Sequence, residues 1–162
     1  MARFAELTER WLKVFTSTLL VAMVLVILSQ VAFRYALNLS LAWTEEVGRY
    51  LFVWICLFGA SLGYRYGQHS GYETIVAALP AAAGRWVMTA VDGLVALFSV
   101  VLMMSSRELI EAGMGQLTPA TEFRIAYVYF AFPLSALATL VFVVDAVRKR
   151  WLAGLAPPAV ER

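Results

Sequence analysis

Four long apolar segments are the feature that most limits the fold. Residues 14–33 contain no charged side chain, and each of the other three segments contains one at most. The other three segments are 47–64, 86–104 and 125–144. A helix of about 20 mostly apolar residues crosses the hydrocarbon core of a bilayer. Since a backbone in lipid must satisfy its own hydrogen bonds, each segment is predicted to be a helix. The sequence therefore predicts an all-α integral membrane protein with a four-transmembrane-helix bundle over residues 1–152, followed by a flexible tail, 153–162.

The composition argues against a water-soluble domain and against an enzyme. Hydrophobic residues make up 62% of the chain and charged residues 15%, whereas soluble domains are about 45–50% apolar and about 25% charged. The single cysteine, Cys56, excludes an intrachain disulfide, and the single histidine, His69, excludes a haem held by two histidines of this chain. No phosphate-binding loop, zinc-protease motif or nucleophile elbow occurs. We therefore predict no catalytic, substrate-binding or metal-binding residue and no cofactor.

The distribution of lysine and arginine predicts the orientation in the membrane. Nine of these residues lie in the N-terminal segment, in the loop between the second and third spans, and in the C-terminal tail, whereas four lie on the other side. Loops that stay in the cytoplasm are enriched in lysine and arginine. Both termini are therefore expected in the cytoplasm, with loops 34–46 and 105–124 outside. A net charge of +2 gives no indication of nucleic-acid binding.

The N-terminal segment before the first span allows two interpretations. Residues 2–13 place Phe4, Leu7, Trp11 and Leu12 on one helical face. This pattern fits a short helix lying in the membrane interface, and it equally fits an extension of the first span. The first span is expected to be retained, because its apolar run is longer than the h-region of a signal peptide, about 7–15 residues.

A polar cluster is predicted where the second span enters the membrane from outside. Trp43 is expected at the depth of the lipid headgroups, and Arg49 lies three and four residues after the acids Glu46 and Glu45. Either acid can pair with this arginine on a helix. The cluster is then structural, an ion pair beside an aromatic anchor. Alternatively, one carboxylate is left over for a partner protein or a bound lipid.

Asp92 is the deepest carboxylate in any predicted span, about two turns from the cytoplasmic end. An ionisable residue inside a span suggests function, but we favour a structural polar contact, in which Arg65 at the end of the second span reaches toward Asp92. A small-residue patch in the second span, Gly59-Ala60-Ser61 with Gly63, is predicted to pack against a neighbouring helix. Pro133 is predicted to bend the fourth span.

These residues resemble the small permease subunit of tripartite ATP-independent periplasmic (TRAP) transporters. The resemblance rests on a basic residue, a Trp-x-Glu-Glu motif followed by an arginine, a small-residue patch, and then an arginine, a glycine and a histidine. In this chain they are Arg34, Trp43, Glu45, Glu46, Arg49, Gly59, Arg65, Gly67 and His69. A second matching patch comprises Thr118-Pro119 and Tyr127-Val128-Tyr129-Phe130-Ala131-Phe132-Pro133.

The resemblance implies a scaffold role in a sodium-coupled symporter that imports an organic acid. The partners it implies are a large multi-span permease subunit, which carries the substrate and sodium sites, and a periplasmic substrate-binding protein, which docks on the outer surface. Membrane lipids are expected around the spans. A second hypothesis is a self-assembling membrane channel or exporter that uses Asp92 as its coupling group.

Overall fold

The fold was analysed in a computed structural model that describes residues 2–39, 41–67 and 81–153. Its helices are α1 (Ala2–Ala36), α2 (Ala42–Arg65), α4 (Ala81–Met114), α5 (Ala126–Tyr129) and α6 (Ala131–Ala153). Four segments are long and apolar enough to cross a membrane: α1, α2, α4, and α5 together with α6. The prediction of an all-α protein with four membrane-spanning helices is confirmed.

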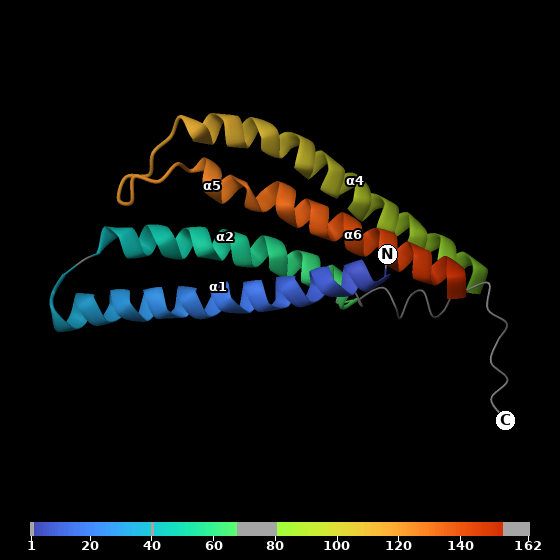
Figure 1. The fold of residues 1–162 in the computed structure, drawn as a ribbon, viewed down its shortest axis with the longest axis horizontal. Coiled ribbons are helices and arrows are strands. Elements are labelled where there is room, and N and C mark those ends of the chain that lie inside the picture. The colour runs from blue at the N-terminus through green and yellow to red at the C-terminus, as the bar shows by residue number, and fades with distance from the viewer. Residues whose placement is uncertain (1, 40, 68–80, 154–162) are drawn as a thin grey trace, which may run out of the picture.

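The helices form an open layer in the order α1, α2, α6, α4 (Figure 1). α1 packs along α2, α2 along α6, and α6 along α4, while the backbones of α2 and α4 stay apart. Residues 37–39 and 115–125 lie at one end of the layer, which we call the loop end (Figure 1). The N-terminus of α1 and the C-terminus of α6 lie at the opposite end, the terminal end (Figure 1).

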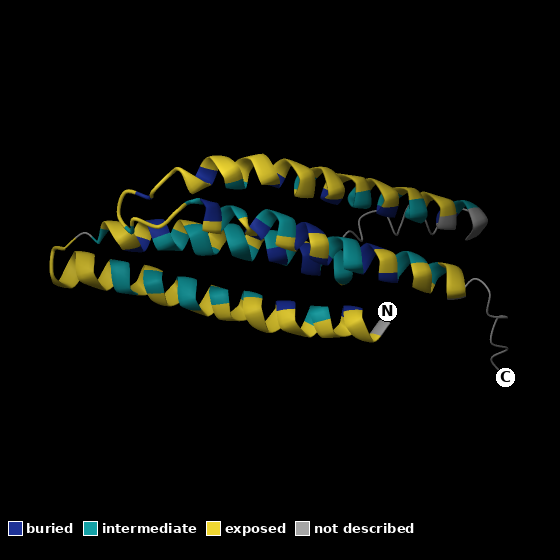
Figure 2. Cartoon of the chain, turned by 45° about the horizontal axis from the view of Figure 1, so that its top comes forward, coloured by how far each residue is buried: buried dark blue, intermediate teal, exposed yellow. Residues whose placement is uncertain are grey.

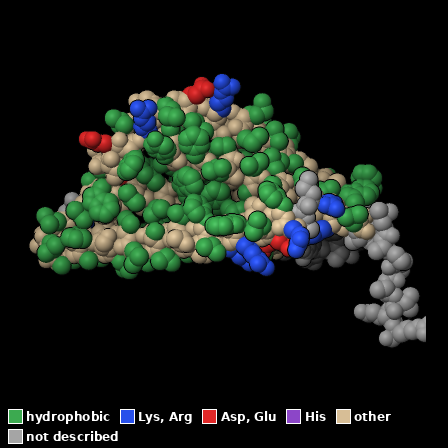
Figure 3. All heavy atoms as spheres, viewed as in Figure 1, with side chains coloured by type: hydrophobic (Ala, Val, Ile, Leu, Met, Phe, Trp, Pro, Cys, Tyr) green, Lys and Arg blue, Asp and Glu red, His purple; other side chains and the backbone are tan. Residues whose placement is uncertain are grey.

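The buried core of this layer is small. It comprises five side chains from α1, α2 and α6: Leu12, Phe58, Leu62, Ala138 and Phe142. None of the most apolar part of α1 is buried within the chain, and Figure 2 shows exposed residues along most of α1 and α4. Hydrophobic side chains cover most of the face in Figure 3. Because lipid solvates such surfaces, an open layer is tolerable in a membrane, where packing and polar contacts hold helices together.

The N-terminal segment extends the first span. α1 is continuous from Ala2, so a separate helix in the membrane interface is not found. The apolar face expected over residues 2–13 is divided, because Leu12 is buried whereas Phe4, Leu7 and Trp11 are exposed.

The fourth span is interrupted at Phe130, between α5 and α6. Pro133 lies in the first turn of α6, and its nitrogen carries no hydrogen to donate to the carbonyl of Tyr129. The distortion expected from Pro133 is therefore found just before it. The predicted tail, 153–162, lies outside the described residues except for Ala153, which ends α6. Most of the loop between the second and third spans also lies outside them, and residues 81–84 of that loop already belong to α4.

The small-residue patch of α2 packs less than expected. Ser61 is buried against α6, but Ala60 is exposed and a Cβ at Gly59 would meet nothing within 4 Å. The close approach is made elsewhere, by Gly113 near the end of α4. A Cβ there would lie 2.8 Å from the backbone nitrogen of Ala126 and 2.9 Å from Cδ2 of Tyr129. Gly113 thus allows α4 to touch α5 at the loop end.

Gly113→Ala is expected to destabilise the protein by about 1–3 kcal/mol, the usual cost of overpacking, because the backbone of Ala126 cannot move aside easily. Thermal unfolding of the purified protein in detergent measures this. Gly93→Ala in the same helix is the matched control, since a Cβ at Gly93 meets nothing within 4 Å. This control gains helix propensity of up to about 1 kcal/mol. Equal melting temperatures for the two variants would contradict the role given to Gly113.

Candidate functional site

At the loop end, the carboxylate of Glu46 holds the loop between α4 and α5. Its Oε2 accepts hydrogen bonds from the backbone nitrogens of Ala120 (3.2 Å) and Thr121 (2.9 Å) and from the Thr121 hydroxyl (3.0 Å). Its Oε1 accepts from the hydroxyl of Tyr50, one turn further along α2, at 2.8 Å. Glu46 is buried. Four donors satisfy a carboxylate that would otherwise be costly to bury.

The loop held by Glu46 is a tight turn built around Thr118. The Thr118 backbone nitrogen donates to the carbonyl of Phe123 at 2.9 Å, and the Phe123 nitrogen donates to the Thr118 hydroxyl at 3.0 Å. Glu122 within the turn has a positive φ of 55°, a conformation uncommon for residues other than glycine. Leu117 and Phe123 at the two ends of the turn are exposed. The turn therefore exposes apolar side chains on a backbone that the Glu46 carboxylate holds in place.

The polar cluster predicted at the start of α2 is divided between two roles. Glu45 pairs with Arg49 at 3.4 Å, and both side chains are exposed, so the predicted ion pair is confirmed. The carboxylate expected to be left over is not available, because Glu46 points inward to the loop. Trp43 is exposed beside them. A pattern of spacing along one helix could not show that the second acid meets a segment more than seventy residues away.

At the terminal end, Arg65 joins three helices. Its Nε donates to Glu9 Oε2 of α1 at 3.0 Å, and its Nη1 donates to Asp145 Oδ2 of α6 at 2.6 Å. Lys149 also pairs with Asp145 at 2.8 Å, and the guanidinium lies over the ring of Phe142. The Asp145 side chain is only 3% exposed. This network ties α1, α2 and α6 together at the terminal end.

Asp92 of α4 belongs to a second network. Its Oδ2 accepts from Nη1 of Arg150 at 2.5 Å, and its Oδ1 accepts from the hydroxyl of Tyr64 at 2.6 Å. The expected contact between Arg65 and Asp92 is therefore wrong. Arg65 turns toward α1 and α6, because α2 packs on those helices and its backbone stays apart from α4. The structural polar contact favoured for Asp92 is present, with different partners.

The remaining predicted site residues are less engaged. Arg34 is exposed in the last turn of α1. His69 lies outside the described residues. Sequence reasoning missed five residues of the two networks at the terminal end: Glu9, Tyr64, Asp145, Lys149 and Arg150. The sequence offered one indication of these networks, because charged residues near the ends of spans suggest ion pairs between helices. It could not indicate which residues pair, because that depends on the order of the helices in the layer.

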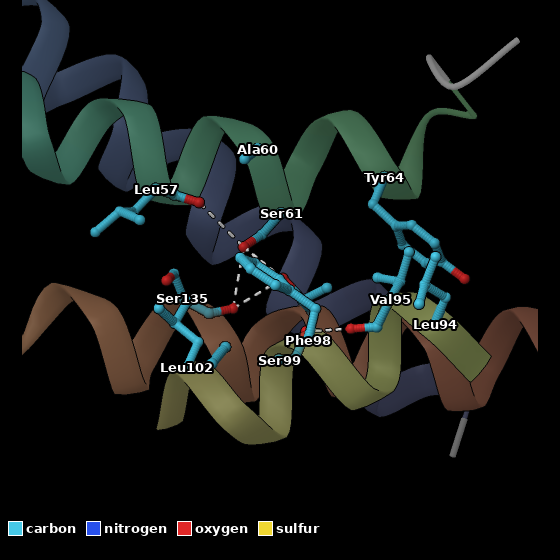
Figure 4. Close-up of a pocket in the computed structure, with 12 residues that line it drawn as sticks. Leu57, Ala60, Ser61, Tyr64, Leu94, Val95, Phe98, Ser99, Leu102 and Ser135 are labelled. Atoms are coloured by element: carbon cyan, nitrogen blue, oxygen red, sulfur yellow. Dashed lines mark hydrogen bonds between the residues drawn. The ribbon is translucent and has the colours of Figure 1, made fainter. Parts of the chain in front are cut away.

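A groove runs between α2 and α4, with α6 as its floor (Figure 4). Its volume is about 520 Å³ and its walls are mostly apolar. In its floor, Ser61 bonds the Ser135 carbonyl at 3.0 Å and the Thr139 hydroxyl at 2.9 Å. In the described part of the chain, no three His, Cys, Asp or Glu side chains are grouped to hold a metal ion. The geometry is therefore that of helix-joining contacts at two ends and an apolar groove between them.

Glu46→Ala is expected to free the loop at residues 118–123, because the Ala120 and Thr121 amides lose their acceptor. Each of these bonds to a charged acceptor contributes about 1.5–3 kcal/mol at most, since Ala120 is exposed and Thr121 half-buried. Hydrogen exchange followed by mass spectrometry should show faster exchange in this loop and a lower melting temperature. Glu45→Ala is the control, since an exposed ion pair is worth about 0–1 kcal/mol. If both variants leave the loop equally protected, Glu46 does not hold it.

Comparison with known proteins places these features in a family. Residues 23–153 match the family described as "Tripartite ATP-independent periplasmic transporters, DctQ component". The chain is 31% identical over 80 residues to a TRAP transporter small permease protein of Haemophilus influenzae, covering 49% of this chain and 50% of the relative. It is 32% identical over 108 residues to the ectoine TRAP transporter small permease protein TeaB of Halomonas elongata, covering 65% and 56%.

A third relative is the C4-dicarboxylate TRAP transporter small permease protein DctQ of Rhodobacter capsulatus, 29% identical over 101 residues. That match covers 61% of this chain and 44% of the relative, so the chain spans about half the length of these three curated relatives. The family match, however, extends from the middle of α1 to the end of α6. The chain therefore belongs to the DctQ component family of tripartite ATP-independent periplasmic transporters, and it is a small membrane permease subunit rather than an enzyme.

Proposed function

We propose that this chain is the scaffold subunit of a sodium-coupled TRAP transporter in a bacterial inner membrane, and that it packs against a large multi-span permease subunit. The observation that supports this is the open layer. Its two broad faces expose apolar side chains along every span, and its buried carboxylates Glu46, Asp92 and Asp145 are all bonded within the chain. Such a layer suits a fixed support for a larger bundle, with packing as the attraction between them.

We assign the sodium and substrate sites to the large subunit. Within the described spans, the buried ionisable side chains are engaged in the networks of Glu46, Arg65 and Asp92. The relatives TeaB and DctQ carry the words ectoine and C4-dicarboxylate in their names, and both are carboxylated organic solutes. We propose that this transporter likewise imports an organic acid delivered by a periplasmic binding protein.

The loop end is the surface that we propose for docking of the binding protein. The turn around Thr118 is fixed by Glu46 and exposes Leu117 and Phe123, and Trp43 is exposed at the same end. A surface held in one conformation before binding loses less entropy when the partner docks. In this proposal Glu46 promotes docking by holding the loop in one conformation, and it does not itself contact the binding protein.

The orientation can be tested with single cysteines. With Cys56→Ser as background, Ala120→Cys at the loop end is expected to react with a membrane-impermeant maleimide applied to intact spheroplasts. Arg3→Cys at the terminal end is expected to react only after the membrane is opened, because the terminal end is proposed to face the cytoplasm. The reverse labelling pattern would overturn the orientation. The second helix thus begins outside in our proposal, as the balance of lysine and arginine predicts.

The scaffold role is tested by co-purification and uptake. The tagged chain, extracted in mild detergent, is expected to bring down one large polytopic subunit in near-equal amount. Substrate uptake into proteoliposomes should need both subunits, the binding protein and a sodium gradient. As a control, Arg107→Gln removes the exposed ion pair of Arg107 with Glu111 on α4. This variant is expected to leave co-purification and uptake unchanged. Recovery of the chain with itself alone would contradict the scaffold role and would favour the self-assembling channel with Asp92.

A further inference from the structure

The groove between α2 and α4 has the dimensions of a lipid chain. Along α4 it extends from Leu94 to Leu102, about 12 Å at 1.5 Å per residue, close to half of the roughly 30 Å hydrocarbon core. The groove holds about 520 Å³, which is sufficient for a flexible hydrocarbon chain.

The interior of the groove is dry in character. The hydroxyls of its serines donate to backbone carbonyls of their own helices or to each other: Ser99 to Val95 at 2.8 Å, and Ser135 to Phe132 at 2.9 Å. Most of the other lining side chains are Leu, Val, Ala and Phe (Figure 4). A surface whose polar hydrogens are already used fits hydrocarbon better than water or a polar ligand.

The groove ends at a cation. Arg150 lies eleven residues after Thr139 on α6, about 20° away around the helix, so it follows the floor of the groove toward the terminal end. Its bond to Asp92 uses Nη1, one of several donor groups on the guanidinium. Tyr64, which bonds the same carboxylate, lines the groove. Trp86 and Trp151 pack edge to face at 5.7 Å beyond Arg150, in keeping with tryptophans at headgroup depth.

The charge at the terminal end complements an anion. The acids Glu9, Asp92 and Asp145 are turned inward, with side chains 19%, 6% and 3% exposed. Lys13 and Lys149 are each 52% exposed. These ion pairs turn three acids inward, while Lys13 and Lys149 stay partly exposed at the terminal end, where Glu6 is also exposed.

We propose that this groove binds an anionic phospholipid, with one acyl chain lying along α6 between α2 and α4 and the phosphate beside Arg150. The aromatic pair of Trp86 and Trp151, beyond Arg150, then lies at the level of the lipid headgroup. The lipid fills the space that α2 and α4 leave between them, and it completes the layer on that face.

The probes are phosphatidylglycerol and phosphatidylcholine with identical acyl chains, offered in equal amounts to the delipidated full chain in detergent. Native mass spectrometry counts the lipid that each chain retains. We expect one tightly held phosphatidylglycerol, preferred about fivefold over phosphatidylcholine, the effect of roughly one cationic side chain at an anionic lipid. If the unsubstituted chain retains the two lipids equally, the proposal is overturned.

Matched variants then test the headgroup and the groove separately. Asp92→Asn with Arg150→Gln removes both charges of the pair together and is expected to abolish the preference. Arg148→Gln should keep it, since Arg148 is exposed and nine residues from Thr139, on the opposite face of α6. Ala60→Phe fills the groove from an exposed position and should remove both lipids, whereas Ala32→Phe on the exposed face of α1 should not. The site is overturned if Arg148→Gln loses as much of the preference for phosphatidylglycerol as the double variant does. It is also overturned if Ala60→Phe retains all of the bound lipid.

Discussion

Arg65 is the residue on which the rest of the layer depends. Helices in lipid gain little from burying apolar side chains against one another, because lipid solvates those side chains equally well. One guanidinium between Glu9 and Asp145 therefore fixes the relative position of α1, α2 and α6. Breaking a buried pair by removing one partner typically costs about 3–5 kcal/mol, which is comparable to the free energy of unfolding of a small domain.

The polar contacts at the two ends of the layer have different roles. At the terminal end they join helices to one another, through Arg65 and through Asp92. At the loop end Glu46 joins a helix to a loop, and this fixes a surface rather than an interface between spans. A scaffold subunit needs both properties, a fixed helix arrangement for its membrane partner and a fixed outer surface for a soluble one.

The sequence predicted the parts of this structure that depend on one segment at a time. The four spans follow from the length and apolarity of each segment, and the pair of Glu45 with Arg49 follows from helical spacing. The partner of Arg65 could not be obtained in this way, because it depends on which helices are neighbours. In the expected topology, Asp92 was close enough to pair with Arg65. In the structure, α6 lies between α2 and α4, and Asp145 of α6 pairs with Arg65 instead. For the same reason the sequence left open which acid pairs with Arg49, since the loop that Glu46 contacts is distant in sequence.

The order of helices in the layer also bears on how the chain is made. α1 with α2, and α4 with α6, are antiparallel pairs that follow one another along the chain, and the two pairs meet through α2 and α6. Each hairpin can therefore form as soon as its second helix leaves the insertion machinery, before the rest of the chain exists. Docking of the two hairpins comes last, and it is the step that closes the ion pair of Arg65 with Asp145. Folding in the membrane would then take two local steps and one long-range step, in which Glu46, Ser61 and Tyr64 of α2 also meet their partners in the second hairpin.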